Sequence, residues 1–142
     1  MGLHFIRINV EKNTNITKDS KIEINNKFKI TDISHREPPV KGAGEVVRID
    51  FNFTVDYSPK IGKISLDGYL LYLEKSKLIK TALDEWNKNK KVNQELLSKI
   101  IQPALYRCHL KALLMCQEVN LPPHLPIIPK PIPRKKAEEY IG

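Results

Sequence analysis

The chain has few of the residues that build disulfide-linked or metal-holding proteins. Only two cysteines, Cys108 and Cys116, occur among its 142 residues. They belong to no Cys-x-x-Cys spacing or Cys/His cluster, so no zinc site is indicated. In the helix predicted below, they stand about 12 Å apart along the axis, beyond the reach of one disulfide. We expect two small buried thiols and a cytoplasmic, reducing location.

The sequence also lacks the patterns of membrane spans, phosphate-binding loops and common catalytic sites. No segment approaches the roughly 20 apolar residues that a membrane-spanning helix requires, and no secretory signal is visible. The 6 glycines are dispersed, and Gly42-Ala43-Gly44 lacks the following lysine and hydroxyl residue of a phosphate loop. No nucleophile elbow or metalloprotease motif occurs. We therefore predict a protein that is not an enzyme, uses no cofactor and does not insert into a membrane.

The charge is mostly of one sign but is not concentrated. Lysines and arginines number 24 against 16 acids, which gives a formal net charge of +8. Such an excess makes nucleic acid the first partner to consider. However, the densest basic runs, at 88–91 and 134–136, are not interleaved with aromatic residues on which bases could stack. Nucleic acid is therefore a possible partner but not the favoured one.

The first half of the chain reads as strands. Period-two alternation predicts strands over residues 3–11, 21–34, 45–57 and 63–73, with a bend or bulge at Asn25-Asn26. Nothing before residue 74 is long enough for a helical crossover, so the sheet is predicted to be antiparallel. The clearest strand has six apolar residues on one face: Val47, Ile49, Phe51, Phe53, Val55 and Tyr57.

Two helices follow the strands. An amphipathic pattern predicts the first over residues 74–89, and Asn93 is a plausible N-cap for the second, which runs to about residue 118. Pro103 lacks a backbone donor, so a kink or break is expected at 99–103. The second helix is apolar on two sides, which indicates that it packs on the sheet and on a second body, either another subunit or a client. One stripe contains Ile101, Leu105, Cys108, Ala112 and Met115; the residues that widen it are Tyr106, Leu110, Leu113 and Leu114.

The C-terminal part is rich in proline. Six of the 10 prolines fall between residues 122 and 133, which favours extended conformations. Apolar residues such as Leu121 and Leu125 lie among them. The segment therefore reads either as an ordered strap across the core or as a free recognition tail.

Together these elements resemble the SecB-like chaperone family, as an archaeal-type or otherwise divergent member. The most specific match is Ile-Gln-Pro-Ala-Leu-Tyr-Arg at 101–107, followed by Asn-Leu-Pro-Pro at 120–123. Weaker matches are Phe-Ile-Arg-Ile at 5–8, Glu-Val-Val at 45–47 and Asp-Gly-Tyr at 67–69. The resemblance implies a single α+β domain over 1–142: a four-stranded antiparallel sheet (1–73), a connecting helix and a long C-terminal helix on one face (74–118), and a proline-rich strap and tail (119–142).

The resemblance also implies a function. Members of the family are ATP-independent holdases that bind unfolded polypeptides in apolar grooves between sheet and helix and assemble as dimers or tetramers. By position, client binding would fall to Ile24, Phe28, Tyr69, Leu71, Leu78 and Trp86. The oligomer interface would involve the helix stripe Ile101, Leu105, Cys108, Ala112 and Met115. The mixed charges on the wet face of residues 45–73 match the family's acidic docking face poorly, so a hand-off to a translocation motor is not carried over.

A different class of function remains open. A fold does not determine a function, so the chain could be a non-catalytic interaction subunit or an RNA- or ribosome-associated factor that uses its basic surface.

Overall fold

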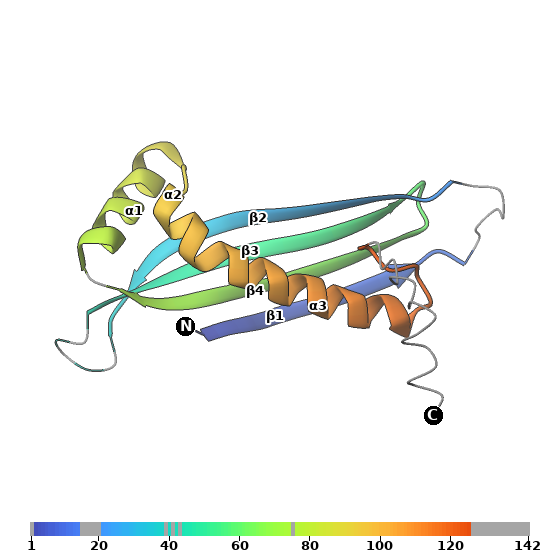
Figure 1. The fold of residues 1–142 in the computed structure, drawn as a ribbon, viewed down its shortest axis with the longest axis horizontal. Coiled ribbons are helices and arrows are strands. Elements are labelled where there is room, and N and C mark those ends of the chain that lie inside the picture. Colours follow the sequence, from blue (N-terminus) through green and yellow to red (C-terminus); the bar gives the residue numbers. More distant parts are fainter. Residues whose placement is uncertain are drawn as a thin grey trace, which may run out of the picture.

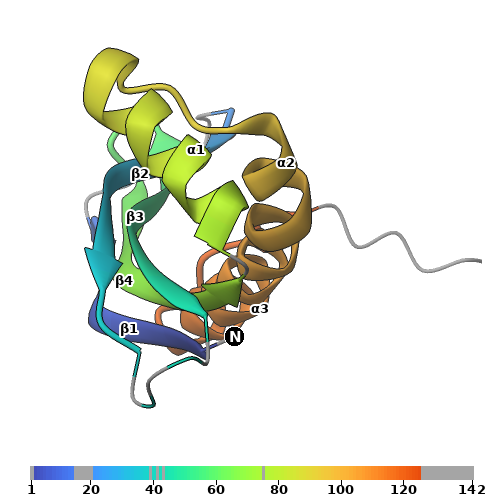
Figure 2. The ribbon, with the colours of Figure 1, turned by 90° about the vertical axis from the view of Figure 1, so that its left-hand side faces the viewer.

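The fold is a four-stranded antiparallel sheet with its helices on one face. The computed structural model describes residues 2–14, 21–38, 40, 42, 44–74 and 76–125. Its strands are β1 (Gly2–Lys12), β2 (Glu23–Arg36), β3 (Glu45–Ser58) and β4 (Gly62–Glu74), in the sheet order β1-β4-β3-β2 (Figure 1). They are followed by α1 (Ser76–Asn89), the short α2 (Gln94–Leu96), the π-helical turn η1 (Leu97–Ile101) and α3 (Gln102–Glu118). Viewed along the strands, the helices cover one side of a curved sheet (Figure 2). The predicted fold class is confirmed.

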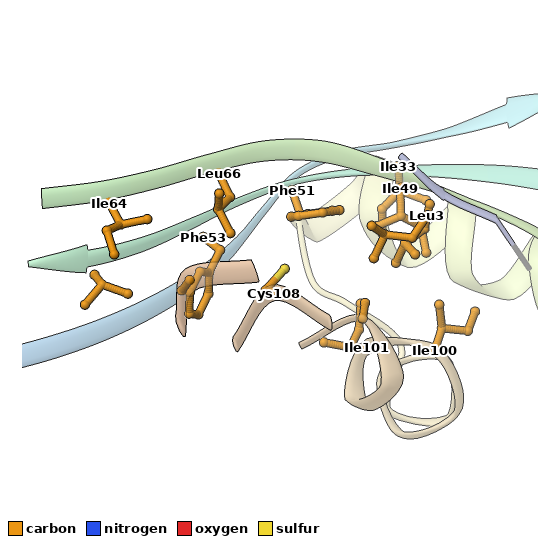
Figure 3. Close-up of a cluster of buried hydrophobic side chains, with 14 of the residues drawn as sticks. Leu3, Ile33, Ile49, Phe51, Phe53, Ile64, Leu66, Ile100, Ile101 and Cys108 are labelled. Carbon is orange, nitrogen blue, oxygen red and sulfur yellow. The ribbon is translucent and has the colours of Figure 1, made fainter. Parts of the chain in front are cut away.

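The central strand β3 supplies much of the core. Its six alternating apolar side chains, from Val47 to Tyr57, are all buried under the helices, as their period-two spacing predicted. β4 places Ile64, Leu66 and Leu70 on the same face. Figure 3 shows side chains of β3 and β4 meeting those of η1 and α3 in one layer between sheet and helix.

Helix α3 lies close to the sheet because its inward stripe is made of small residues. The fully buried positions recur at four-residue steps and are Ala104, Cys108, Ala112 and Cys116. Short side chains let the helix backbone approach the strands, and larger residues at the flanks complete the packing. Both cysteines are buried free thiols, as predicted.

The start of the second helical segment is irregular where the sequence predicted it. The Asn93 side chain accepts a hydrogen bond from the Glu95 backbone amide at 3.0 Å, so Asn93 caps the segment. The five-residue π-helical turn η1 then ends just before the first turn of α3, which contains Pro103. Pro103 has no backbone N–H to donate to the preceding turn, so the regular α-helical hydrogen-bond pattern cannot continue through it. The change to π-helical pitch in η1 occurs at this break in the pattern.

The strand irregularities differ from those expected. The pairing of β2 with β3 runs unbroken through Asn25 and Asn26 and shifts only between Ile30 and Asp32. The prediction of a bulge at Asn25-Asn26 is therefore wrong. Asn26 occupies a helix-side position opposite Val55, but it stays exposed at the edge of the sheet, where its amide remains in water. A second shift lies between Phe5 and Arg7 in β1 and leaves Ile6 63% exposed.

The segment after α3 folds back onto the domain as far as it is described. We call residues 119–125 the strap. Its Leu121 is buried against Gly62, where an added Cβ would stand 3.0 Å from Leu121 Cδ1. The Leu121 backbone amide donates to the Cys116 carbonyl at 2.9 Å. The predicted proline-rich tail beyond Leu125 lies outside the described residues.

Candidate functional site

The helices cover the two halves of the sheet unequally. α3 packs on β4 and β1, whereas α1 packs on β2 and β3 near one end of the sheet. Much of the helix-side face of β2 is therefore only partly covered. Ile24, Phe28 and Ile30 are half-buried there, and the Phe28 ring stacks on Phe51 with 5.3 Å between ring centroids.

A groove lies between the start of β2 and the end of α3. Its volume is about 690 Å³, and we call it the β2–α3 groove. The lining residues are Ile22, Leu113, Cys116, Gln117, Asn120, Leu121, Pro122 and Pro123. Ile22 is 45% exposed at its mouth. Ile24 and Phe28 continue the same face of the strand, so an apolar strip extends from the groove along β2. Apolar side chains that remain this accessible in a folded monomer are typical of binding surfaces.

The residues predicted to bind clients do not all come together. Ile24 and Phe28 lie on the apolar strip beside the groove. Tyr69 and Leu71 lie on the opposite face of the sheet, because they alternate with the buried Leu70. The Leu78 side chain is outside the described part of the chain.

Trp86 is held inside rather than in the groove. It is buried between α1 and the sheet, and its indole N–H donates to Asp32 Oδ1 at 3.3 Å. The Lys90 ammonium lies 5.0 Å from the centre of the indole. These contacts give Trp86 a structural task, which is to fix α1 to β2.

The face of the sheet away from the helices is mixed: Val46, Leu71 and the 51% exposed Leu73 are apolar, and an aromatic and charged cluster lies beside them. Tyr69 stacks on His4 with 5.0 Å between ring centroids, and the Arg48 guanidinium lies 4.0 Å from the centre of the tyrosine ring. Arg48 also pairs with Asp50 at 3.0 Å. Two charges of opposite sign thus neutralise each other beside Tyr69, and the face presents no continuous acidic surface here.

The helix stripe predicted for the oligomer interface faces the sheet. Ile101, Cys108 and Ala112 are buried within the chain, and Leu105 and Met115 are half-buried against the core. The apolar residues that α3 turns outward are instead Tyr106, Leu110 and Leu114, which are 66%, 46% and 54% exposed. They recur at four-residue steps and so form one stripe. The predicted two-sided apolar character of the helix is therefore observed, with the outward side carried by the widening residues.

A histidine pair joins the strap to α3, and sequence analysis did not anticipate it. His109 Nδ1 and His124 Nε2 are 2.8 Å apart, and the two rings are stacked with an interplanar angle of 11°. Phe53 of β3 meets both rings edge-on. Burial lowers the pKa of His109; burial and the neighbouring His109 lower the pKa of His124 to about 4. No sequence signal links two histidines fifteen positions apart across a helix end.

A second polar contact fixes the strap beside this pair. The Tyr57 hydroxyl donates to the Pro122 carbonyl at 2.7 Å, so the Cys116 thiol, 2.9 Å away, donates to the same hydroxyl oxygen. Burial and the contact with Cys116 raise the pKa of Tyr57. Burial also raises the pKa of the Cys108 thiol to about 12, so this cysteine is inert as a nucleophile.

Two kinds of site are not found in the described part of the chain. No group of three or more His, Cys, Asp or Glu side chains there is placed to hold a metal ion. None of its helices is long and apolar enough to cross a membrane.

Comparison with known proteins gives a match in structure but not in sequence. No protein-family model matches the chain, and no curated protein matches it. A four-stranded antiparallel sheet with a long C-terminal helix on one face is, however, the SecB-like fold. One solved structure that this chain matches is the SecB-like chaperone Rv1957 of Mycobacterium tuberculosis in complex with a ChAD peptide from the Rv1956 HigA1 antitoxin. The TM-score is 0.51 over 93% of this chain and 91% of that chain, at 13% sequence identity. The predicted resemblance is thereby confirmed as a likeness of fold.

Proposed function

We propose that this protein is an ATP-independent holdase that binds unfolded polypeptide in the β2–α3 groove and along the apolar strip of β2. The observation that carries the proposal is the groove itself, whose apolar walls stay open between sheet and helix. The fold likeness supports it, since the similar mycobacterial chaperone is bound to a peptide. A cytoplasmic location belongs to the proposal, supported by two free thiols.

The groove offers an unfolded chain two kinds of contact. Within the described residues, β2 pairs only with β3, so its outer edge keeps backbone N–H and C=O groups available. An extended client can add to this edge by backbone hydrogen bonds, which do not depend on client sequence. Its apolar side chains can bury against Ile22, Ile24 and Phe28 at the same time. Backbone pairing with apolar burial suits a holdase, which has to accept many sequences.

The test compares two substitutions of exposed β-branched residues by aspartate. Ile22→Asp places a charge at the mouth of the groove; Val40→Asp, at a loop residue that is 65% exposed, is the matched control. We expect the unaltered protein and Val40→Asp to suppress aggregation of a denatured client without ATP. Ile22→Asp should weaken client affinity by about 10-fold, as lost apolar burial of one side chain implies. Equal activity of the two variants, or no suppression at equimolar protein, would contradict the proposal.

We further propose that a second copy of the chain covers the outward stripe of α3. Three exposed apolar residues at four-residue spacing, Tyr106, Leu110 and Leu114, suit helix-to-helix packing between copies. Light scattering should give a dimer or tetramer of the 16.4 kDa chain. The double variant Leu110→Glu with Leu114→Glu should shift the mass to the monomer. Arg107→Glu, an equal charge change at an exposed polar position of α3, should not. A monomeric unaltered protein at micromolar concentration would refute this assembly.

A further inference from the structure

The strap closes one end of the β2–α3 groove and is held there by a small number of contacts. Leu121, Pro122 and Pro123 form part of the groove wall. Leu121 fills the space over Gly62, and Pro122 accepts the Tyr57 hydrogen bond. His124 contacts His109 of α3. Whatever loosens these contacts changes the shape of the groove.

Among these contacts, the His109–His124 pair is the one whose charge can change between neutral pH and pH 5. His124 is only 5% exposed, and its Nδ1 atom is buried without a hydrogen-bond partner among the described residues. The close contact between the rings requires one N–H and one bare nitrogen, because two N–H groups facing each other would repel. When His124 Nε2–H donates to His109 Nδ1, His124 Nδ1 is bare, and a proton added there would form a buried N–H with no partner among the described residues. The geometry therefore accepts the neutral pair and penalises the charged one.

Within the described part of the chain, no negative charge is placed to compensate a protonated His124. From α3, the titratable groups that face the strap are His109 and the Cys116 thiol; from β3, it is Tyr57; from β1, it is Lys12, a cation that donates to the Asn120 carbonyl. Phe53 of β3, which meets the His124 ring, is apolar. The influences on the charge of His124 are its burial and His109, with no carboxylate among them. A histidinium at this position would be buried beside a second imidazole and an aromatic ring edge.

We propose that the His109–His124 pair is a pH-sensitive latch: the strap is closed while both imidazoles are neutral, and it opens when His124 takes up a proton. Opening removes Leu121, Pro122 and Pro123 from the wall of the β2–α3 groove and lengthens the apolar surface along β2. The second half of this inference, a wider client site at low pH, rests on the proposed function. The first half does not.

The direction and range of the response follow from the proton affinities. With the strap open, His124 has the ordinary histidine pKa of 6.5; with the strap closed, its pKa is lowered to about 4. The open form therefore binds more protons between these values, so the closed form loses stability as the pH falls from 6.5 towards 4. Going from pH 7.5 to 5.0 should raise the ratio of open to closed strap by about 30-fold.

Amide hydrogen exchange followed by mass spectrometry tests the latch. The readout is exchange in residues 117–125, which contain the Leu121 amide bonded to Cys116, relative to residues 49–55 of β3. Rates are corrected for intrinsic exchange at each pH. In the unaltered protein, we expect strap opening to rise by about 30-fold from pH 7.5 to 5.0 while β3 stays protected. His124→Phe keeps an aromatic ring against His109 but cannot titrate, so its strap should respond by less than about 3-fold.

His4→Phe is the matched control, because His4 also stacks on a ring, that of Tyr69, but is exposed. It should behave as the unaltered protein does. A strap that opens no more than β3, or a His124→Phe strap with the full response, overturns the latch. If His124→Phe does not fold, nitrogen chemical shifts of the imidazoles in the unaltered protein decide the question. Strap amide signals that move with the His124 titration support the latch, and signals that do not follow it overturn the latch.

Client capture measured in the same samples separates the two proposals. Stronger capture at pH 5.0 than at pH 7.5 in the unaltered protein, but not in His124→Phe, supports a latch that controls the groove. Strap opening without client capture at either pH refutes the proposed holdase and leaves the latch standing. Capture without any strap response refutes the latch and leaves the holdase standing.

Discussion

Strands β2 and β3 run side by side with the same kind of apolar alternation, yet only β3 is sealed. The helix-side residues of β3 are buried from Val47 to Tyr57, whereas Ile24, Phe28 and Ile30 of β2 are half-buried. The difference comes from position: β3 is central and lies under helices, while β2 is an edge strand that α1 covers at one end only. Equal patterns therefore serve two purposes. β3 stabilises the fold, and β2 provides the surface that we assign to clients.

The largest predicted effect is on the stability supplied by β3. Phe53→Ala removes a fully buried ring and should lower the free energy of unfolding by about 3–5 kcal/mol. Phe28→Ala, at the residue paired with Phe53 on β2, should lower it by only about 1–2 kcal/mol because part of that side chain is already in water. Urea denaturation at fixed protein concentration measures both. Similar losses for the two variants would remove the distinction between the strands.

A smaller loss is expected from a backbone position in the sealed half of the sheet. Gly68 of β4 lies opposite Phe5 and Phe51. A Cβ there would collide with the His4 carbonyl oxygen and stand 2.9 Å from Phe51 Cζ. Gly68→Ala should therefore cost about 1–3 kcal/mol of stability and loosen β1. Denaturation together with amide exchange in β1 checks this, and an unchanged β1 would show that the strand pair can relax around a methyl group.

The smallest effect concerns the boundary between the sealed core and the open groove. Tyr57→Phe keeps the ring of this β3 residue but removes its hydrogen bonds to Pro122 and Cys116. We expect a loss of about 1 kcal/mol in global stability, with faster exchange of the Leu121 amide. If exchange in the strap stays the same, Tyr57 is part of the core only and does not hold the strap.

Much of the fold could be predicted from the sequence because its signals are local. The alternation from Val47 to Tyr57, the cap at Asn93 and the break at Pro103 each involve neighbouring residues, and each is observed. The bulge was misplaced at Asn25-Asn26 because a polar residue at a sheet edge can keep the register by remaining in water. Nothing in the alternation distinguishes that situation from a slipped strand.

The site was less predictable because it depends on how distant elements lie. Tyr69 and Leu71 lie in β4 near the end at which the sequence predicts a covering element. Because they alternate with the buried Leu70, however, they lie on the face away from the helices. The burial of the stripe Ile101 to Met115, and the exposure of Tyr106, follow from the angle at which α3 meets the sheet. The histidine latch requires the strap to turn back over α3, and periodicity carries no information on such a turn.

The pairing of β1 with β4 limits the order in which the strands of the sheet can pair during synthesis. Lys12 pairs with Gly62 and Gly2 with Leu71, so β1, the first of the four strands, cannot pair until β4, the last of them, has been synthesised. Until β4 has been synthesised, Ile6 and Ile8 lie on a strand with no neighbour. The strap closes later still, because its seat needs both Lys12, which donates to the Asn120 carbonyl, and Gly62. A docked strap is therefore a record that β1 and β4 have paired at the Lys12–Gly62 end of the sheet.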